Sequence, residues 1–132
     1  MEDFVNFEIA KKLKEKGFKE ECLAYYHTDG ELLYNKDQYR GGDLKSLLRS
    51  YNSLPKNPIG VEQIDAPTIS QVLKWLREEK GIHVCIALGE FSDWMYDVSR
   101  VDGNMFCKAE DDFKSYEQAV LAGVNYCLEN LI

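Results

Sequence analysis

At 132 residues, the chain has the length of one ordinary domain. Its composition is 45% hydrophobic and 12% aromatic, which excludes the aromatic-poor composition of disordered proteins. The net charge is −7, and this acidity argues against nucleic-acid binding, because such binding depends on Lys and Arg side chains that neutralise phosphates. We therefore expect a folded, acidic protein that has no nucleic-acid partner.

The N-terminal sequence MEDFVNFE has no apolar signal segment, and the longest apolar run, residues 84–88, is too short to span a bilayer. We therefore expect a cytoplasmic protein that has no membrane partner. No C-x-x-C pair occurs, so the cysteines are interpreted as small core residues rather than as metal ligands or a disulfide framework. The four cysteines are Cys22, Cys85, Cys107 and Cys127.

The first predicted element is a helix over roughly residues 6–16, with Asn6 as its N-cap and Gly17 just past its end. Two β-prone runs then flank Asp29-Gly30, a pair that is typical of tight hairpin turns. Residues 1–35 are therefore predicted to form a helix followed by a β-hairpin.

Residues 36–65 are predicted to form an irregular insert, because Gly41-Gly42, Pro55 and Pro58 interrupt any regular pattern. Asp43 is a candidate cap for one short helix in this region. Apolar residues within the insert indicate that it packs against the rest of the chain. A small-ligand pocket beneath such a long connection is one candidate for function.

The second half has clearer boundaries. Thr68-x-x-Gln71 has the form of a capping box and predicts a helix that ends at Gly81. Ser115-x-x-Gln118 predicts a second helix, whose apolar residues recur at helical spacing up to Leu131. Between the two helices, alternating runs separated by turn residues predict three strands, at residues 82–88, 94–99 and 105–108.

These elements predict an α+β fold in a single domain, residues 1–132, in which helices pack on one face of an antiparallel sheet. The connections between strands are too short for parallel crossovers, so the strands should form a meander. Residues 66–132 are expected to have the order helix–strand–strand–strand–helix, preceded by the helix and hairpin and by the insert.

The order of the second half is that of double-stranded RNA-binding domains. Those domains need a basic edge at the second helix for phosphate contact. Here residues 109–115 read Ala-Glu-Asp-Asp-Phe-Lys-Ser, which is acidic at that edge. The likeness is therefore one of topology, and RNA binding is not expected.

Carboxylates in residues 93–112 are candidates for a small metal-dependent hydrolase site, since oxygen ligands suit Mg²⁺ and Ca²⁺. Their spacing matches no calcium loop, and acidic residues ahead of a helix are favoured by its dipole alone. The sequence also lacks G-x-G-x-x-G, Walker A, H-E-x-x-H and G-x-S-x-G motifs. We therefore predict no catalytic residue, no metal site and no cofactor.

Aromatic residues gather on the two predicted hairpins. Strict alternation along a strand means that some of these rings point away from the core that their neighbours enter. Exposed aromatic side chains are typical anchors of protein interfaces. The predicted interaction surface consists of Phe91, Trp94, Tyr96, Tyr25 and Tyr26.

Four segments resemble a family of small uncharacterised proteins from gut Bacteroidales genomes and their phage-like elements. These segments are residues 7–26, 64–78, 81–84 and 115–128, so the resemblance covers most of the chain outside the insert. The shared positions are mainly helix caps and core residues, which specify fold rather than chemistry. The resemblance implies a bacterial cytoplasmic protein, of phage or mobile-element origin, and it implies no activity.

The sequence favours a non-enzymatic protein-interaction module that binds a protein partner or a second copy of itself. The alternatives are the carboxylate-based metal-dependent hydrolase and the small-ligand-binding domain.

Overall fold

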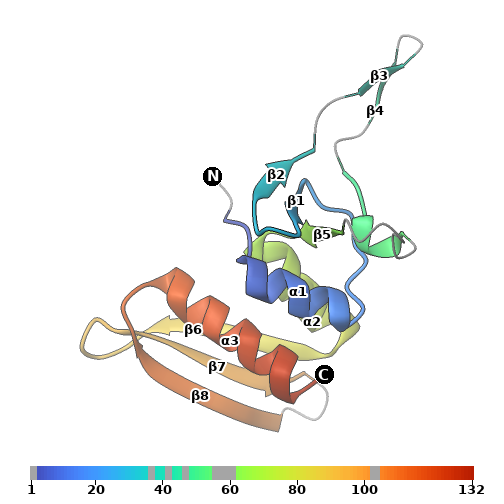
Figure 1. Ribbon diagram of the computed structural model, residues 1–132. Helices are drawn as coiled ribbons and strands as arrows, with labels where there is room; N and C mark the ends of the chain where they lie inside the picture. The colour runs from blue at the N-terminus through green and yellow to red at the C-terminus, as the bar shows by residue number, and fades with distance from the viewer. Residues whose placement is uncertain (1–2, 36–37, 41–42, 46–47, 55–61, 102–104) are drawn as a thin grey trace. The chain divides into compact units, whose positions relative to one another are not determined.

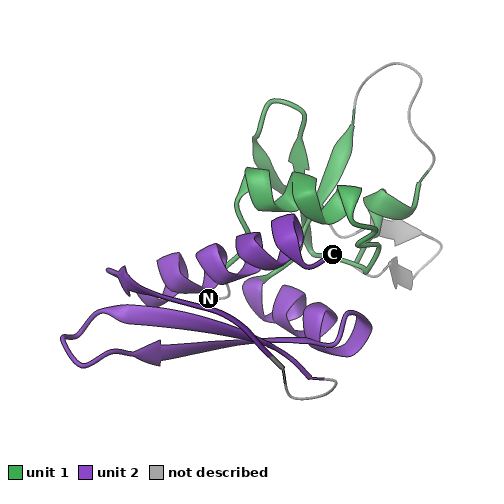
Figure 2. Cartoon of the chain, turned by 90° about the horizontal axis from the view of Figure 1, so that it is seen from below, with its two compact units in different colours: residues 1–68 green, residues 69–132 purple. Residues whose placement is uncertain are grey.

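The computed structural model describes residues 3–35, 38–40, 43–45, 48–54, 62–101 and 105–132 (Figure 1). The chain divides into two compact units, unit 1 (Met1–Thr68) and unit 2 (Ile69–Ile132), coloured separately in Figure 2. The boundary lies three residues beyond the start of the predicted 66–132 unit. The expectation of one domain across the whole chain stays a prediction.

Unit 1 begins with a helix, α1 (Phe7–Glu15), which confirms the predicted helix. The Asn6 side chain accepts a hydrogen bond from the backbone N–H of Ile9 at 2.9 Å, so it caps the helix as expected. Gly17 follows with φ of 90°, a left-handed conformation that glycine adopts without steric cost.

The predicted hairpin is also present, as β1 (Ala24–His27) and β2 (Leu32–Tyr34). Gly30 has φ of 88° in the turn, and the Asp29 carboxylate accepts from the backbone N–H of Glu31 at 2.9 Å. A third strand, β5 (Gln63–Ala66), pairs antiparallel with β1, which gives the sheet order β2-β1-β5.

The described part of the insert contains short pieces of regular structure. It includes β3 (Gln38–Arg40), β4 (Asp43–Lys45) and the 3₁₀ helix η1 (Tyr51–Ser53). The prediction of a short helix that starts at Asp43 is wrong for residues 43–45, because these residues form a strand that pairs with β3. An isolated helical turn has marginal stability, because its first hydrogen bond must fix the backbone of several residues. Here residues 43–45 can instead form hydrogen bonds with the strand β3 just upstream.

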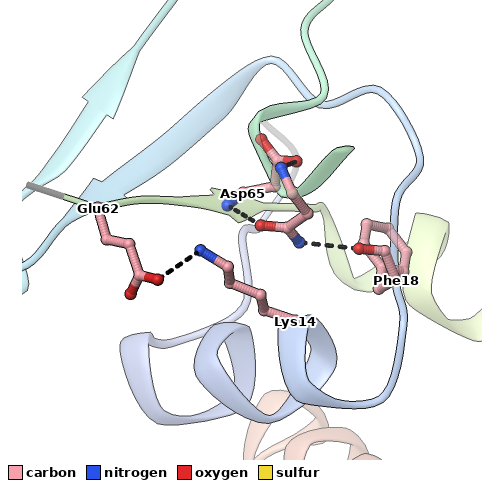
Figure 3. Close-up of polar contacts among 5 residues, drawn as sticks. Lys14, Phe18, Glu62 and Asp65 are labelled. Carbon is pink, nitrogen blue, oxygen red and sulfur yellow. Dashed lines mark hydrogen bonds and ion pairs between the residues drawn. The ribbon is translucent and has the colours of Figure 1, made fainter. Parts of the chain in front are cut away.

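The interior of unit 1 is apolar on the helix side and polar beside η1. The Asn52 side chain donates to the Phe18 carbonyl at 2.9 Å and accepts from the backbone N–H of Asp65 at 3.2 Å (Figure 3). Lys14 of α1 forms an ion pair with Glu62 at 3.2 Å. The buried apolar residues are Val5, Ile9, Ala10, Leu13, Phe18, Cys22, Ala24, Tyr26, Ile64 and Ala66.

Unit 2 has the predicted helix–strand–strand–strand–helix order. Its elements are α2 (Ile69–Glu79), β6 (Ile82–Leu88), β7 (Trp94–Arg100), β8 (Met105–Phe113) and α3 (Tyr116–Asn130). The strands form an antiparallel meander, β6-β7-β8, and the two helices pack against one face of it (Figures 1 and 2). The α+β fold and the helix-covered sheet are therefore confirmed.

The C-terminal helix begins at the predicted capping box. The Ser115 hydroxyl accepts from the backbone N–H of Gln118 at 3.1 Å, and the Gln118 side chain accepts from the backbone N–H of Lys114 at 3.2 Å. Gly123 allows close approach to the sheet, since a Cβ at this position would lie 3.0 Å from Val84 Cγ1 and 3.1 Å from Tyr96 Cγ. The helix therefore packs directly on the centre of the sheet.

Strand β8 is longer than the four residues predicted for it. It continues through the acidic residues Glu110, Asp111 and Asp112 to Phe113, which the sequence places in the connection before α3. Pairing with β7 overrides the low strand propensity of Asp and Glu.

Within the described residues, none of the helices combines the length and the apolarity that crossing a bilayer requires.

Candidate functional site

One end of the sheet in unit 2 brings together four elements and a group of large apolar side chains. The last residue of β6 pairs with the first residue of β7, Leu88 with Trp94, and Trp94 pairs in turn with Phe113 at the end of β8. The ring of Tyr116, which starts α3, lies edge-on to Trp94 with 5.5 Å between centroids. In Figure 1, the β6–β7 turn and the start of α3 lie at this same end. We name the group the aromatic end, consisting of Leu88, Phe91, Trp94, Phe113 and Tyr116.

The aromatic end is exposed at its surface and packed at its base. Phe91, in the β6–β7 turn, is 84% exposed, Leu88 is 58% exposed and Tyr116 is 48% exposed. Trp94 and Phe113 are half-buried. Scattered single apolar residues are normal on a protein surface, but contiguous patches mark interaction sites.

The backbone on both sides of the aromatic end is unusual. Among the described residues, Ser92 (φ 64°) and Asp112 (φ 70°) are the two non-glycine residues with positive φ. At Asp112, β8 carries an extra residue, because Trp94 pairs with Phe113 while Tyr96 pairs with Glu110. Such a bulge redirects the side chain that follows it. Here it places Phe113 opposite Trp94.

Tyr96 supports the aromatic end from beneath and is not part of the surface. Its residue is 1% exposed, its ring lies 5.8 Å from that of Phe113, and its hydroxyl donates to Glu110 Oε2 at 2.9 Å. Burial raises the pKa of the Tyr96 phenol, and its hydrogen bond to Glu110 raises the pKa further. The prediction that Tyr96 lies on an exposed surface is therefore corrected: its strand position faces α3, where it fills the core.

The two predicted surface residues of unit 1 have different positions. Tyr26 is buried on the α1 side of the sheet, and its hydroxyl donates to the Val5 carbonyl at 2.6 Å, so it too is a core residue. Tyr25 faces the other side and is half-buried, with its ring 4.8 Å from Tyr51 and 6.1 Å from His27. Alternation along β1 separates the two tyrosines, as the sequence predicts, but the sequence does not say which one is buried.

Sequence reasoning found Phe91 and Trp94 and missed Leu88, Phe113 and Tyr116. The signal for Leu88 was available, because it is the last apolar residue of the alternating run of β6. Phe113 could not be placed without the extension of β8 and its bulge. Tyr116 is the first residue of a helix whose apolar stripe suggests burial throughout, although its position at the helix end leaves it half-exposed.

The carboxylates proposed for a hydrolase do not assemble into a site in the described part of the chain. Asp97 is opposite Ala109 and Cys85 on the sheet, while Asp111 and Asp112 lie in the bulged strand. Among the residues that the structure describes, no three His, Cys, Asp or Glu side chains form a group that could hold a metal ion. Much of the insert beneath which a ligand pocket was predicted, including residues 55–61, lies outside the described residues.

The cysteines are divided between the two units, with Cys22 in unit 1 and the other three in unit 2. Cys22 and Cys127 are buried, as expected of core residues, and Cys85 and Cys107 are half-buried. Burial raises the pKa of the Cys127 thiol to about 12, with the neighbouring Cys107 as the next cause. A thiol with such a pKa stays protonated at neutral pH and is a poor nucleophile.

No family model matches this chain, and neither a curated protein nor a solved structure shows significant similarity to it.

Proposed function

We propose that the chain is a protein-interaction module and that it binds its partner, another protein or a second copy, through the aromatic end of unit 2. The observation that carries this proposal is that Trp94, half-buried, contacts the exposed Leu88 and Tyr116, and that the adjoining β6–β7 turn carries the exposed Phe91. Aromatic side chains of this kind provide most of the binding energy at many interfaces. The resemblance noted from the sequence adds the proposal of a bacterial cytoplasmic protein of mobile-element origin.

The aromatic end is also held in place before any partner arrives. Trp94 is fixed by cross-strand neighbours on both sides and by the edge of the Tyr116 ring. Side chains that are already ordered lose less conformational entropy on binding. This rigidity favours a role in recognition over a passive role in covering the core.

The proposal is tested with a matched pair of single substitutions in affinity capture from lysate of the native host. Phe91→Ser removes the most exposed ring of the aromatic end, while Phe106→Ser removes an equally apolar ring, 63% exposed, from β8 near the opposite end of the sheet. We expect the partner to be retained by the wild type and by F106S. The partner should bind F91S about 30-fold more weakly than it binds the wild type, because the loss of an interface anchor costs about 2 kcal/mol of binding free energy.

Two readouts complete the experiment. Thermal unfolding should show that both variants keep their fold, since both side chains are exposed. A second copy of the chain with a different tag reports self-association in the same capture. Equal retention of every captured protein by F91S and by the wild type would contradict the proposal.

A further inference from the structure

The two segments that form the aromatic end carry an excess of negative charge. One segment lies around the β6–β7 turn and the other runs from the end of β8 into α3. Lys114 is the one basic residue in residues 88–94 and 110–117, and the acidic residues of these segments are Glu90, Asp93, Glu110, Asp111, Asp112 and Glu117.

Most of these carboxylates are directed toward solvent. Glu90, Asp111, Asp112 and Glu117 are exposed, and Asp93 is half-exposed. Glu110 is exposed as well, although one of its oxygens accepts from the Tyr96 hydroxyl. An apolar centre with a charged rim is the usual anatomy of a protein interface, in which the rim selects the partner.

From this arrangement we infer the chemistry of the partner: the aromatic end binds a basic polypeptide segment that inserts a large apolar side chain between Phe91 and Tyr116. This inference rests on the proposed function. Lys and Arg on the partner would meet the acidic rim, and their attraction would speed the encounter. The apolar side chain would cover the rings that are exposed in the free protein.

The same charges disfavour the other occupants. A second copy would bring its own six carboxylates against the first six, and like charges across an interface oppose association. The phosphates of nucleic acid and the anionic headgroups of a bilayer would be repelled in the same way. A basic protein segment is the occupant that satisfies both the ring surface and the rim.

The test uses a library of random 12-residue peptides displayed on mRNA, selected against the full-length protein. Peptides that also bind F91S are removed, because this variant keeps every carboxylate and retains those that bind by charge alone. We expect the surviving peptides to combine Trp, Phe or Leu with several Lys or Arg and few acidic residues. These peptides should bind F106S as tightly as the wild type.

A charge variant then tests the contribution of the acidic residues to binding independently of the aromatic rings. The combined substitutions Glu90→Gln, Asp93→Asn, Asp111→Asn and Glu117→Gln keep all five apolar residues and leave Glu110 and Asp112 in place. At low salt, we expect the selected peptides to bind the charge variant roughly tenfold more weakly than they bind the wild type. At about 0.5 M salt, where surface charges are screened, we expect the two proteins to bind these peptides equally.

The outcomes distinguish the two proposals. Peptides that require Phe91 but are neutral or acidic, and that bind the charge variant unchanged, would overturn the basic partner and leave the proposed function standing. A selection that yields no peptide dependent on Phe91 would overturn both.

Discussion

Asp65 is the most deeply buried carboxyl group described in the chain. Its residue is 1% exposed, and its two oxygens accept from the backbone N–H groups of Tyr51 at 3.0 Å and Asn52 at 2.9 Å. Burial raises the pKa of this carboxyl above its ordinary value of 3.8, although the two hydrogen bonds and the charge of Lys14 lower it in part. A carboxylate that is costly to bury makes the stability of unit 1 dependent on pH.

The sign of this dependence follows from the direction of the shift. Because the folded pKa lies above the unfolded one, the stabilisation from Asp65 is complete below the unfolded pKa and is lost as pH rises through the folded pKa. We therefore expect the free energy of unfolding of the wild type, relative to that of Asp65→Asn, to decrease as pH rises above the ordinary carboxyl pKa of about 4. Urea unfolding of both proteins at a series of pH values measures this difference.

An NMR titration of the Asp65 carboxyl carbon in the wild type provides the control, since it needs no substitution. A difference in stability that grows with pH, together with a titration midpoint below 3.8, would show that the two hydrogen bonds outweigh burial.

Asp112 is strained in a way that a pair of substitutions can measure. Its φ of 70° lies in the left-handed region, where a β-branched side chain clashes with its own backbone. We expect Asp112→Val to lower the free energy of unfolding by about 1–2 kcal/mol. Asp111→Val makes the same chemical change at the neighbouring exposed residue and should change the free energy of unfolding by less than about 0.5 kcal/mol. Equal losses in the two variants, measured by urea unfolding, would rule out backbone strain as the cause.

The sequence is least informative about which individual aromatic side chains are buried. Alternation correctly separates Tyr25 from Tyr26 and places Trp94 and Tyr96 on one face of β7. It does not say which face a helix covers, or that α3 begins beside Trp94 and passes over Tyr96. The buried state of Tyr96 and Tyr26 therefore depends on packing between elements that no local pattern encodes.

At the scale of elements, the packing of α3 on the sheet depends on Gly123. Alanine favours a helix by about 1 kcal/mol over glycine. However, the added methyl group would lie 3.0 Å from Val84 Cγ1 and 3.1 Å from Tyr96 Cγ, and both side chains are buried in the core beneath the helix. We expect Gly123→Ala to lower the free energy of unfolding by about 1–3 kcal/mol, the usual cost of overfilling a core.

A double-substitution cycle identifies the contact responsible. Val84→Ala removes the methyl group nearest to the new Cβ, so Gly123→Ala should cost less in that background than in the wild type. Purely additive effects in urea unfolding would place the origin of the destabilisation elsewhere in α3.

Element boundaries were predictable where side chains set them. Asn6 and Ser115 cap their helices as expected, and Asp29-Gly30 forms the expected turn. β5 and the second half of β8 were not predictable, because partner strands stabilise them rather than their own sequences. Asp65 shows the difference, since this acidic residue of β5 pairs with Tyr25 of β1 and accepts hydrogen bonds from two N–H groups of η1.

At the scale of the whole molecule, the fold and the candidate site differ in how much of each the sequence predicts. The helix–strand–strand–strand–helix order of unit 2 follows from caps, turns and alternation, all of which are local. The aromatic end combines residues from positions 88 to 116 and requires the strand register and a bulge. Phe91 and Trp94 were therefore predicted and Leu88 could have been, whereas Phe113 and Tyr116 could not.

The central claim is that the aromatic end contacts a protein partner, and site-specific photocrosslinking in living cells tests it most directly. p-Benzoylphenylalanine replaces Phe91 in one strain and Phe106 in another, so that each crosslinker stands where an exposed ring already was. We predict a discrete crosslinked species for position 91 that is absent for position 106. Crosslinks to the same species from both positions, or from position 106 alone, would contradict the assignment of the aromatic end as the binding surface.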